Sequence, residues 1–355
     1  MSVLMPPQMS NDRRTAVRVR APARLHLGFL DPSGTLGRRF GSLGLVVDGL
    51  DTEVEIVGSP TDAVVAATPS TKGEVERARV CLQRLREHTG RPQALTLRLL
   101  QAMPAHAGFG SGTQLALAIG RAFARWHGLE TESATLARWL GRGARSGIGI
   151  AGFDHGGLLV DGGPNPDGTA APLLARAELP SAWRVVLVQD DRRRGLSGGE
   201  EVQAMGALAA LPQTHAADIC HQVLMRVLPG AASADFASFA TGINQVQSLL
   251  GEHFAPAQGG SAFTSAAVGR LVRWIGAARL EGPKRADDVL PPAAIGQSSW
   301  GPTGFAILPS LASAQAVVAA AHAAGVVDPA LSLRIVAARN LGAAVEDIRD
   351  HRRQA

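Results

Sequence analysis

The chain has 355 residues, of which 46% are hydrophobic and 18% charged, so it can bury a substantial core and most naturally forms two domains. Its 41 glycines and 21 prolines follow no fixed period, which excludes a collagen-like repeat and indicates many tight turns. The net charge of +5 comes from 35 basic residues dispersed against 30 acidic ones, and only 4% of the residues are aromatic, so we expect no nucleic-acid partner.

The start of the chain and its two cysteines indicate where the protein works. Residues 1–14 mix Pro, Gln, Ser and Asn without apolar periodicity, and we expect a disordered leader there. No signal-peptide pattern opens the chain, and no apolar run reaches the roughly 20 residues that a membrane span requires. Cys81 and Cys220 allow at most one disulfide bond. We therefore expect a reduced, cytoplasmic protein with no membrane partner.

Taken in chain order, short apolar runs alternate with segments of helical spacing. In the first half we expect strands at 16–19, 43–47 and 54–57, a helix over 74–88, a strand at 95–99 and a strongly apolar helix over 112–127. In the second half we expect a strand at 184–188, helices through most of 198–250 and over 264–278, a strand at 305–308, a helix over 312–324 and a strand at 332–336. A Pro-, Gly- and Asn-rich seam near 164–180 divides this α+β pattern into domains of 15–178 and 179–355.

The most informative stretch runs from Pro104 to Gln114 and reads Pro-Ala-His-Ala-Gly-Phe-Gly-Ser-Gly-Thr-Gln. It follows a predicted strand and opens a predicted helix, where backbone N–H groups and the helix dipole favour an anion. Small residues let the main chain approach such an anion closely. A serine-capped glycine turn would share part of this pattern, but the full stretch predicts a phosphate cradle, made by Gly108, Gly110, Ser111, Gly112 and Thr113.

Further segments along nearly the whole chain, together with the cradle, resemble the GHMP kinase superfamily. These segments are Ala23–Asp31, Gly37–Gly41, Arg145–Gly149, Phe153–Gly157, Gly195–Gly198, Gln258–Gly260 and Gly296–Pro302. Within the superfamily the chain looks most like the non-kinase branch, the β-ribofuranosylaminobenzene 5′-phosphate synthases. The unbroken run Gln297-Ser298-Ser299-Trp300 is the most specific mark of that branch.

The resemblance implies a two-domain GHMP-kinase-like fold, with a ribosomal-S5-like N-terminal domain and a ferredoxin-like C-terminal domain, in a protein that is usually a homodimer. It also implies a glycosyltransferase that condenses phosphoribosyl pyrophosphate with 4-aminobenzoate and releases CO2 and pyrophosphate, in tetrahydromethanopterin biosynthesis. We expect Mg2+ to accompany phosphoribosyl pyrophosphate and no organic cofactor to be needed. The ten histidines and two cysteines show no zinc spacing, so the metal ligands stay unknown.

One departure from the kinases bears on the reaction. GHMP kinases follow a Ser-Gly pair with an acid that activates the substrate hydroxyl, whereas Ile148 follows Ser146-Gly147 here. An apolar side chain cannot act as that base. The difference favours the synthase, with an ATP-dependent small-molecule kinase and a non-catalytic, anion-sensing relative as the alternatives.

Candidate catalytic residues come from the segments that carry the resemblance. Arg24 and His26 are two residues apart on one predicted strand, so their side chains face the same side. Asp31 and Asp154 are the candidate carboxylates for stabilising positive charge at the anomeric carbon.

Other residues are expected to bind the phosphoryl groups or the acceptor. Arg38 and Arg39 are candidates for phosphoryl oxygens, at even odds with exposure on the surface. Ser197, next to the basic run Arg192–Arg194, is a candidate for a second anion site, against a solvated charged turn. In the C-terminal loop Gln297, Ser298 and Ser299 are expected to contact substrate. Trp300 either packs between glycine turns or lies beside the aromatic acceptor.

Overall fold

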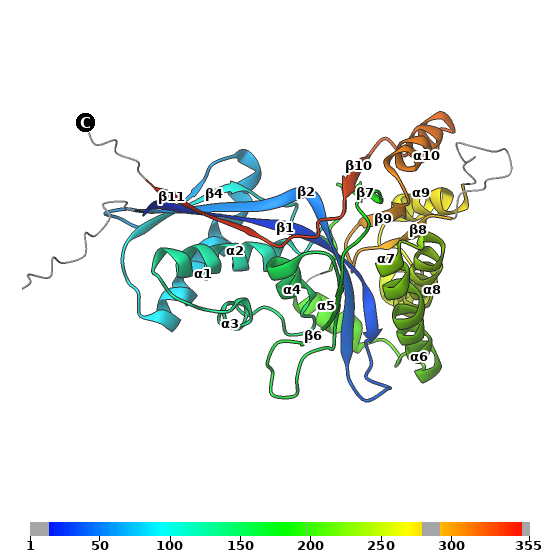
Figure 1. Cartoon of the computed structure of the whole chain (residues 1–355), viewed down its shortest axis with the longest axis horizontal. Coiled ribbons are helices and arrows are strands. Elements are labelled where there is room, and N and C mark those ends of the chain that lie inside the picture. Colours follow the sequence, from blue (N-terminus) through cyan, green and yellow to red (C-terminus); the bar gives the residue numbers. More distant parts are fainter. Residues whose placement is uncertain (1–13, 197, 279–291, 350–355) are drawn as a thin grey trace, which may run out of the picture.

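The computed structural model describes residues 14–196, 198–278 and 292–349 and arranges them around two β-sheets (Figure 1). Residues 1–13 of the expected leader lie outside this part of the chain, and Arg14 already begins the first strand. The described strands form one sheet of seven and one of four, with helices packed against both. This arrangement confirms the α+β prediction.

Two long antiparallel strands, β1 (Arg14–Asp31) and β2 (Phe40–Gly58), form the centre of the first sheet. The sheet continues beside β1 with β11 (Ala344–Arg349), and beside β2 with β4 (Leu95–Gln101) and then the parallel β3 (Ala63–Ala66). The first part of β2 also pairs with β5 (Leu158–Asp161), which pairs in turn with β6 (Leu173–Ala177). The strands expected separately at 43–47 and 54–57 both belong to β2, because the register with β1 shifts between them and pairing continues.

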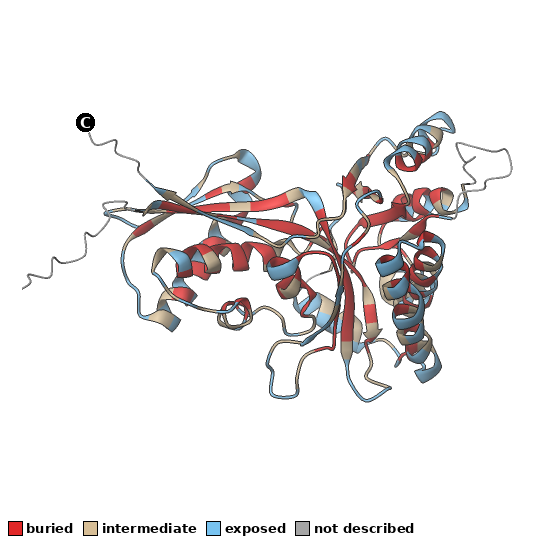
Figure 2. Cartoon of the chain, viewed as in Figure 1, coloured by how far each residue is buried: buried red, intermediate tan, exposed pale blue. Residues whose placement is uncertain are grey.

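Four helices cover one face of this sheet (Figure 1). They are α1 (Val75–Thr89), which follows a short 3-10 turn at Pro69–Glu74, α2 (Ser111–Trp126), α3 (Ser133–Trp139) and α4 (Ile148–His155). Helix α2 is apolar on nearly every side, and its residues from Gln114 to Gly120 are all buried (Figure 2). The expected helices over 74–88 and 112–127 are confirmed, and α2 lies between the sheet and the outer helices.

The second sheet is antiparallel, in the order β10 (Leu331–Ala337), β7 (Arg184–Asp190), β9 (Thr303–Leu308) and β8 (Ala294–Gln297). Residues of β7 alternate between two cores, because successive side chains of a strand point to opposite faces. Val186 and Val188 pack with α9 (Ala266–Ala277) and α10 (Leu311–Ala323), whereas Val185 and Leu187 pack with the helices on the other face.

The segment that leads from β7 to α9 is mostly helical, as expected. It contains α5 (Gly199–Gly206), α6 (Gln213–Gln222), a π-helical turn at Val223–Val227, α7 (Leu228–Ser233), α8 (Phe236–Phe254) and a 3-10 turn at Ala255–Gln258.

The two halves of the chain share one core. Leu25 and Leu27 of β1 lie in the same buried cluster as Phe239 and Ile243 of α8. This shared core fixes the position of α8 beside the first sheet. The boundary between residues 178 and 179 stays a prediction, and β11, which falls in the C-terminal range, pairs with β1 in the first sheet.

Two further observations concern the expected cellular setting. Among the helices of the described ranges, none is long and apolar enough to cross a membrane. Cys81 and Cys220 are both free, Cys81 being buried and Cys220 partly exposed.

Candidate active site

The predicted phosphate cradle is a glycine loop that leads into α2. Gly108 and Gly110 have φ angles of 93° and 74°, in the left-handed region that glycine adopts without strain, and α2 begins at Ser111. The first N–H groups of a helix have no acceptor within it, and the positive end of the dipole lies there. Within the described part of the chain, the hydroxyls of Ser111 and Thr113 also make no hydrogen bond. The loop therefore offers several free donors to an anion.

Three arginines surround this loop. A Cβ atom added at Gly110 would lie 3.0 Å from the Nε and Cζ atoms of Arg24. One added at Gly112 would lie 3.2 Å from Nη2 of Arg77 and 3.5 Å from Nη1 of Arg142. The absence of a side chain at both positions thus lets the guanidinium groups approach the backbone closely.

These arginines differ in how their charge is balanced. Arg77 donates two hydrogen bonds to the carboxylate of Glu74, at 3.2 and 2.9 Å. Burial lowers the pKa of Arg24 to about 10 and also lowers the pKa of Arg142, and the Nε atoms of both side chains are buried without a hydrogen-bond partner in the described residues. A buried cation with unused donors favours an anionic ligand, which would supply both charge and acceptors.

His26 lies beside Arg24 on β1, as its spacing predicts, and its backbone joins the strand to two loops. Its N–H donates to the hydroxyl of Ser298 at 3.0 Å, and that hydroxyl donates to the carbonyl of Gly108 at 2.7 Å. Its carbonyl accepts from the Ser299 N–H at 3.1 Å. The imidazole is 4% exposed, and burial, together with the charges of Arg24 and Arg145, lowers its pKa to about 3. The side chain is therefore neutral at physiological pH.

The loop 296–301 lies directly on the cradle. A Cβ atom at Gly301 would lie 2.5 Å from the nitrogen of Gly108, and one at Gly195 would lie 2.4 Å from the carbonyl oxygen of Trp300. The Gly195 N–H also donates to the carbonyl of His106 at 2.9 Å. Glycines at these positions allow three loops from different parts of the chain to touch.

Some residues of this loop hold it in position, and others line a cavity beside it. Ser298 is fully buried, and its hydroxyl is used between β1 and Gly108, so it positions the loop rather than facing a ligand. Gln297 donates to the Gln258 side chain and to the Ser299 carbonyl, both at 2.9 Å. Ser299 has a φ angle of 54° and lines a cavity together with Gln297.

The two carboxylates predicted to stabilise the anomeric carbon lie elsewhere. Asp31 accepts hydrogen bonds within the turn that follows β1, from the N–H groups of Gly34 (2.8 Å) and Leu36 (2.7 Å) among others. Asp154 is exposed on α4 and accepts from the Ser133 hydroxyl at 2.5 Å. Asp31 is thus used within its own turn and Asp154 between α3 and α4, and the structure brings neither carboxylate to the cradle.

Different acids approach Arg24. Asp161 is fully buried at the end of β5 and accepts from the Ser146 hydroxyl and from the N–H groups of Gly147 and Ile148. Burial raises the pKa of Asp161, and these hydrogen bonds oppose that rise. Glu201 of α5 forms an ion pair with Arg145 at 2.7 Å. The charges of both acids act on Arg24.

The remaining candidates are not part of the cradle. Arg38 donates to the Gly163 carbonyl (3.1 Å) and the Asn165 side chain (2.5 Å), and Arg39 donates to the Pro32 carbonyl (3.1 Å). Arg38 thus joins the β1–β2 connection to the segment after β5, and Arg39 is used within that connection.

The second predicted anion site is only partly described. Ser197 lies outside the described residues. Arg192 pairs with Asp190 at 2.9 Å, and it lines an open pocket with Arg193, Arg194 and the start of α9.

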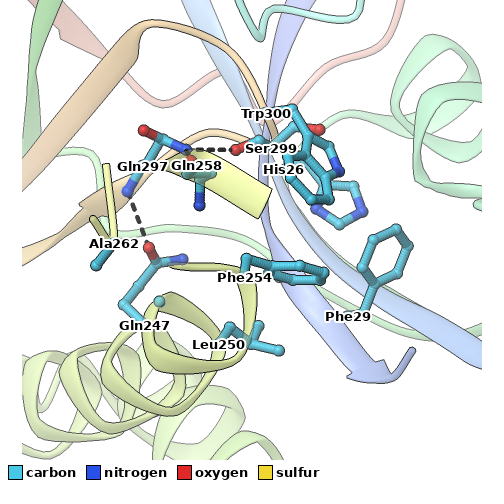
Figure 3. Close-up of a pocket in the computed structure, with 12 residues that line it drawn as sticks. His26, Phe29, Gln247, Leu250, Phe254, Gln258, Ala262, Gln297, Ser299 and Trp300 are labelled. Carbon is cyan, nitrogen blue, oxygen red and sulfur yellow. Dashed lines mark hydrogen bonds between the residues drawn. The ribbon is translucent and has the colours of Figure 1, made fainter. Parts of the chain in front are cut away.

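Beside the cradle lies a cavity of about 40 Å³ lined by His26, Phe29, Phe254, Gln258, Gln297 and Trp300 among others (Figure 3). Trp300 is 4% exposed, and its ring packs edge to face against Phe254 with centroids 4.9 Å apart. Trp300 therefore packs against its neighbours and lines the cavity as well.

No cluster of three His, Cys, Asp or Glu side chains that could hold a metal ion occurs in the described ranges. Mg2+ prefers oxygen ligands and commonly binds through substrate phosphates with few protein ligands. The hydroxyls of Ser111 and Thr113 fit this second arrangement.

Arg77, Arg142 and Glu201 were not expected at the site from the sequence. Arg77 lies on α1 and Arg142 follows α3, and both reach the cradle at Gly112. Glu201 lies on α5, and its charge acts on Arg24. The spacing of these residues along the chain carries no signal of that convergence.

The chain is similar to known proteins of the GHMP kinase group and to named synthases. A model of the GHMP kinases N terminal domain matches residues 76–157, which include the cradle. The chain is 35% identical over 245 residues to a protein named beta-ribofuranosylphenol 5′-phosphate synthase from Archaeoglobus fulgidus, covering 66% of this chain and 76% of that one. It is 30% identical over 246 residues to a protein of the same name from Methanothermobacter thermautotrophicus, covering 64% and 74%.

A solved structure shows the same fold at low sequence identity. The phosphomevalonate kinase of Streptococcus pneumoniae matches with a TM-score of 0.64 at 12% identity, over 92% of this chain and 100% of that one. This likeness, together with the domain match, confirms the expected GHMP-kinase-like fold.

Proposed function

The chain belongs to the beta-ribofuranosylphenol 5′-phosphate synthase family, and on this premise we propose that it transfers the ribosyl 5-phosphate group of phosphoribosyl pyrophosphate to an aromatic ring, with release of pyrophosphate and CO2. The observation that carries the proposal is the convergence of Arg24, Arg77 and Arg142 on the start of α2. A pyrophosphate group carries several negative charges and many acceptor oxygens, which such a set of forked donors suits.

The reaction balances without an added reagent. The bond from the anomeric carbon to the pyrophosphate oxygen breaks, and its electron pair leaves with pyrophosphate. Fixed donors at the cradle stabilise the charge that grows there. The ring carbon that bears the carboxylate then bonds to the anomeric carbon. The bond to the carboxylate breaks last, its electron pair restores the aromatic ring, and CO2 departs.

The acceptor in this proposal is a benzoate with an electron-donating para group. The sequence resemblance implies 4-aminobenzoate, whereas the relatives are named for a ribosylated phenol, which the same reaction would form from 4-hydroxybenzoate. We include both acids and place the step in tetrahydromethanopterin biosynthesis. We also propose that the enzyme works as a homodimer, on small molecules only.

Mg2+ with phosphoribosyl pyrophosphate is part of the same proposal, without an organic cofactor. The metal would neutralise charge on the leaving pyrophosphate, with the Ser111 and Thr113 hydroxyls as the residues that would hold it. The cradle N–H groups and the three arginines then orient the pyrophosphate.

A carboxylate can be assigned to the anomeric centre in place of the two that lie elsewhere. Glu201 acts electrostatically on Arg24 and is partly buried, with Arg145 as its ion-pair partner. We propose that it stabilises the positive charge that develops as pyrophosphate leaves.

The residue after Ser146-Gly147 separates this proposal from a kinase. Ile148 offers no base, and the nearby Asp161 carboxylate is already used by three hydrogen bonds from residues 146–148. Activation of an alcohol acceptor would need a free carboxylate at this place.

The test measures which products the enzyme releases from its substrates. With carboxyl-labelled 4-hydroxybenzoate or 4-aminobenzoate, phosphoribosyl pyrophosphate and Mg2+, labelled CO2 and pyrophosphate should appear in a one-to-one ratio. Benzoate, which lacks the para donor, should react far more slowly. Formation of ADP from ATP with an alcohol acceptor, without CO2, would overturn the proposal in favour of a kinase.

A further inference from the structure

An open pocket of about 660 Å³ lies between the turn that follows β7 and the start of α9. Its lining includes four arginine side chains, those of Arg192, Arg193, Arg194 and Arg270, and we call it the arginine pocket. It shares no lining residue with the small cavity beneath the loop 296–301. The basic run 192–194 is a candidate anion site in the sequence, and α9 adds a fourth arginine to it.

The four arginines differ in whether a carboxylate balances their charge. Arg192 pairs with Asp190 at 2.9 Å and lies 3.7 Å from the carboxylate of Asp328, and these two acids also line the pocket. The side chains of the other three arginines donate no hydrogen bond and form no ion pair within the ranges that the structure describes. All three are exposed, so a ligand in solution can reach them. Three guanidinium groups of the pocket therefore have donors available for an anion.

Hydrogen bonds hold the two walls of the arginine pocket together. Asp190, at the end of β7, is buried and accepts from the Ser265 hydroxyl at 2.7 Å. Its carboxylate also accepts from the Arg192 N–H at 3.2 Å, and its carbonyl accepts from the Arg193 N–H at 3.2 Å. The Ser265 hydroxyl in turn accepts from the Val268 N–H at 3.3 Å, which caps α9. Asp190 therefore joins the basic turn to the start of α9.

The arginine pocket and the cradle both border the loop 296–301. This loop lies on the cradle, and on the pocket side the Thr264 hydroxyl donates to the carbonyl of Trp300 at 3.3 Å. Directly after the basic run, the Gly195 N–H donates to the carbonyl of His106, in the segment that leads into the cradle, at 2.9 Å. The pocket is therefore next to the cradle and separate from it.

The chemistry of the lining favours a phosphate monoester as the ligand. Such a group carries roughly two negative charges at neutral pH and several strong acceptor oxygens, which the planar fork of arginine matches in geometry. Ala266 and Ala267 also line the pocket, where the first N–H groups of α9 add donors for an anion. Among the lining residues that the structure describes, none is aromatic, so no side chain there would stack on a nucleobase.

We infer that the arginine pocket is a second anion site, which binds a phosphate monoester on Arg193, Arg194 and Arg270. The site goes beyond the proposed function, whose steps take place at the cradle. Two sources can supply the phosphate. One is the 5-phosphate of the phosphoribosyl pyrophosphate held at the cradle, and the other is a separate phosphorylated small molecule that binds beside it.

Calorimetry with ribose 5-phosphate, which carries a single phosphate monoester, tests the site. Arg270→Gln and Arg193→Gln should each weaken its binding about fivefold, because each change removes one exposed charged donor. Arg226→Gln is the matched control. Arg226 is also exposed and without a side-chain partner in the described ranges, but it does not line the arginine pocket. This control should bind ribose 5-phosphate as the wild type does.

Pyrophosphate separates the arginine pocket from the cradle. Gly110→Ala should weaken the binding of pyrophosphate and leave that of ribose 5-phosphate unchanged, whereas the two pocket variants should show the reverse. If both pocket variants bind ribose 5-phosphate as tightly as the control does, or if Gly110→Ala abolishes that binding, the arginine pocket is not the site and the inference is wrong.

Phosphoribosyl pyrophosphate identifies the source of the phosphate. If the pocket holds the 5-phosphate of the substrate, both pocket variants should bind phosphoribosyl pyrophosphate more weakly, and ribose 5-phosphate should compete with it. If the pocket holds a separate molecule, that affinity should not change, and ribose 5-phosphate should bind to the complex. Either result supports the site. Because binding is measured without turnover, absence of CO2 release would overturn the proposed function and leave the site standing.

Discussion

The two ends of the candidate site differ in charge. At the cradle, three arginines meet free N–H groups at the start of α2, whereas the cavity beneath the loop 296–301 is lined by no charged side chain at neutral pH. The cradle is suited to a group that gains negative charge, whereas the cavity offers no charge that would bind an anion.

Strand β1 joins these two environments within three residues. Burial lowers the pKa of Arg24 to about 10 and the pKa of His26 to about 3. The same physical cause therefore leaves Arg24 charged and His26 neutral at physiological pH, because the ordinary pKa values of the two groups differ so widely. The contrast between cradle and cavity thus depends on which residue stands at each position of one strand.

A side chain added within the cradle should weaken pyrophosphate binding more than the other substitutions. In Gly110→Ala the added Cβ would lie 3.0 Å from the Arg24 guanidinium, so the donors that face pyrophosphate must move. Loss of two charge-assisted hydrogen bonds, about 3 kcal/mol, predicts roughly hundredfold weaker pyrophosphate binding by calorimetry. Gly90→Ala is the control, since Gly90 is also left-handed but has open space around it. Equal effects of both changes on binding would contradict the cradle.

Removing one cationic side chain should weaken pyrophosphate binding less. Arg142→Met is expected to weaken pyrophosphate binding by about thirtyfold, or roughly 2 kcal/mol, because one partly buried donor is lost. The thermal stability should not fall, since Arg142 is a half-buried cation without an ion-pair partner among the described residues, and burial lowers its pKa. Arg138→Met, on the exposed side of α3, should leave binding unchanged. A loss of stability without a loss of affinity would assign Arg142 a structural role instead.

More of the fold than of the candidate site could be predicted from the sequence. Short apolar runs predicted the strands around α2, and a long run of apolar residues predicted α2 itself. The glycine run predicted the loop before α2 because glycine adopts left-handed turns, as at Gly108 and Gly110, without strain. Strands β3, β5 and β6 have four or five residues each, which is too short for a clear pattern.

The residues of the candidate site were harder to predict from the sequence, because a site depends on contacts between distant segments. Arg24 and His26 were found through strand alternation, whereas Arg77 and Arg142 reach the cradle from helices whose packing no spacing reveals. Asp31 shows the converse. Its place in a segment that carries the family resemblance suggested a catalytic role, whereas its carboxylate accepts hydrogen bonds from the backbone of the turn that follows β1.

The neutral state of His26 predicts a pH dependence of stability. The unfolded chain binds a proton near the ordinary pKa of about 6.5, whereas the folded group does so only near pH 3, so its contribution to stability is complete above pH 6.5 and is lost as the pH falls towards 3. At pH 5 the loss is about 2 kcal/mol relative to pH 8. Denaturant unfolding should show a shallower decline over pH 8 to 5 in His26→Gln. Parallel curves for both proteins would mean that His26 is charged in the cavity.

The smallest expected effect concerns how the loop 296–301 is held between the two environments. Ser298→Ala removes the hydroxyl shared by the His26 N–H and the Gly108 carbonyl, and leaving these buried groups unpaired should cost about 1.5 kcal/mol of stability. Ser299→Ala, whose hydroxyl has no partner in the described ranges, should change stability by less than about 0.5 kcal/mol. Ser298→Thr, which keeps the hydroxyl, should retain more stability than Ser298→Ala. If melting curves of the two alanine variants coincide, Ser298 does not connect the cradle to the cavity, and the loop must be held by its backbone contacts alone.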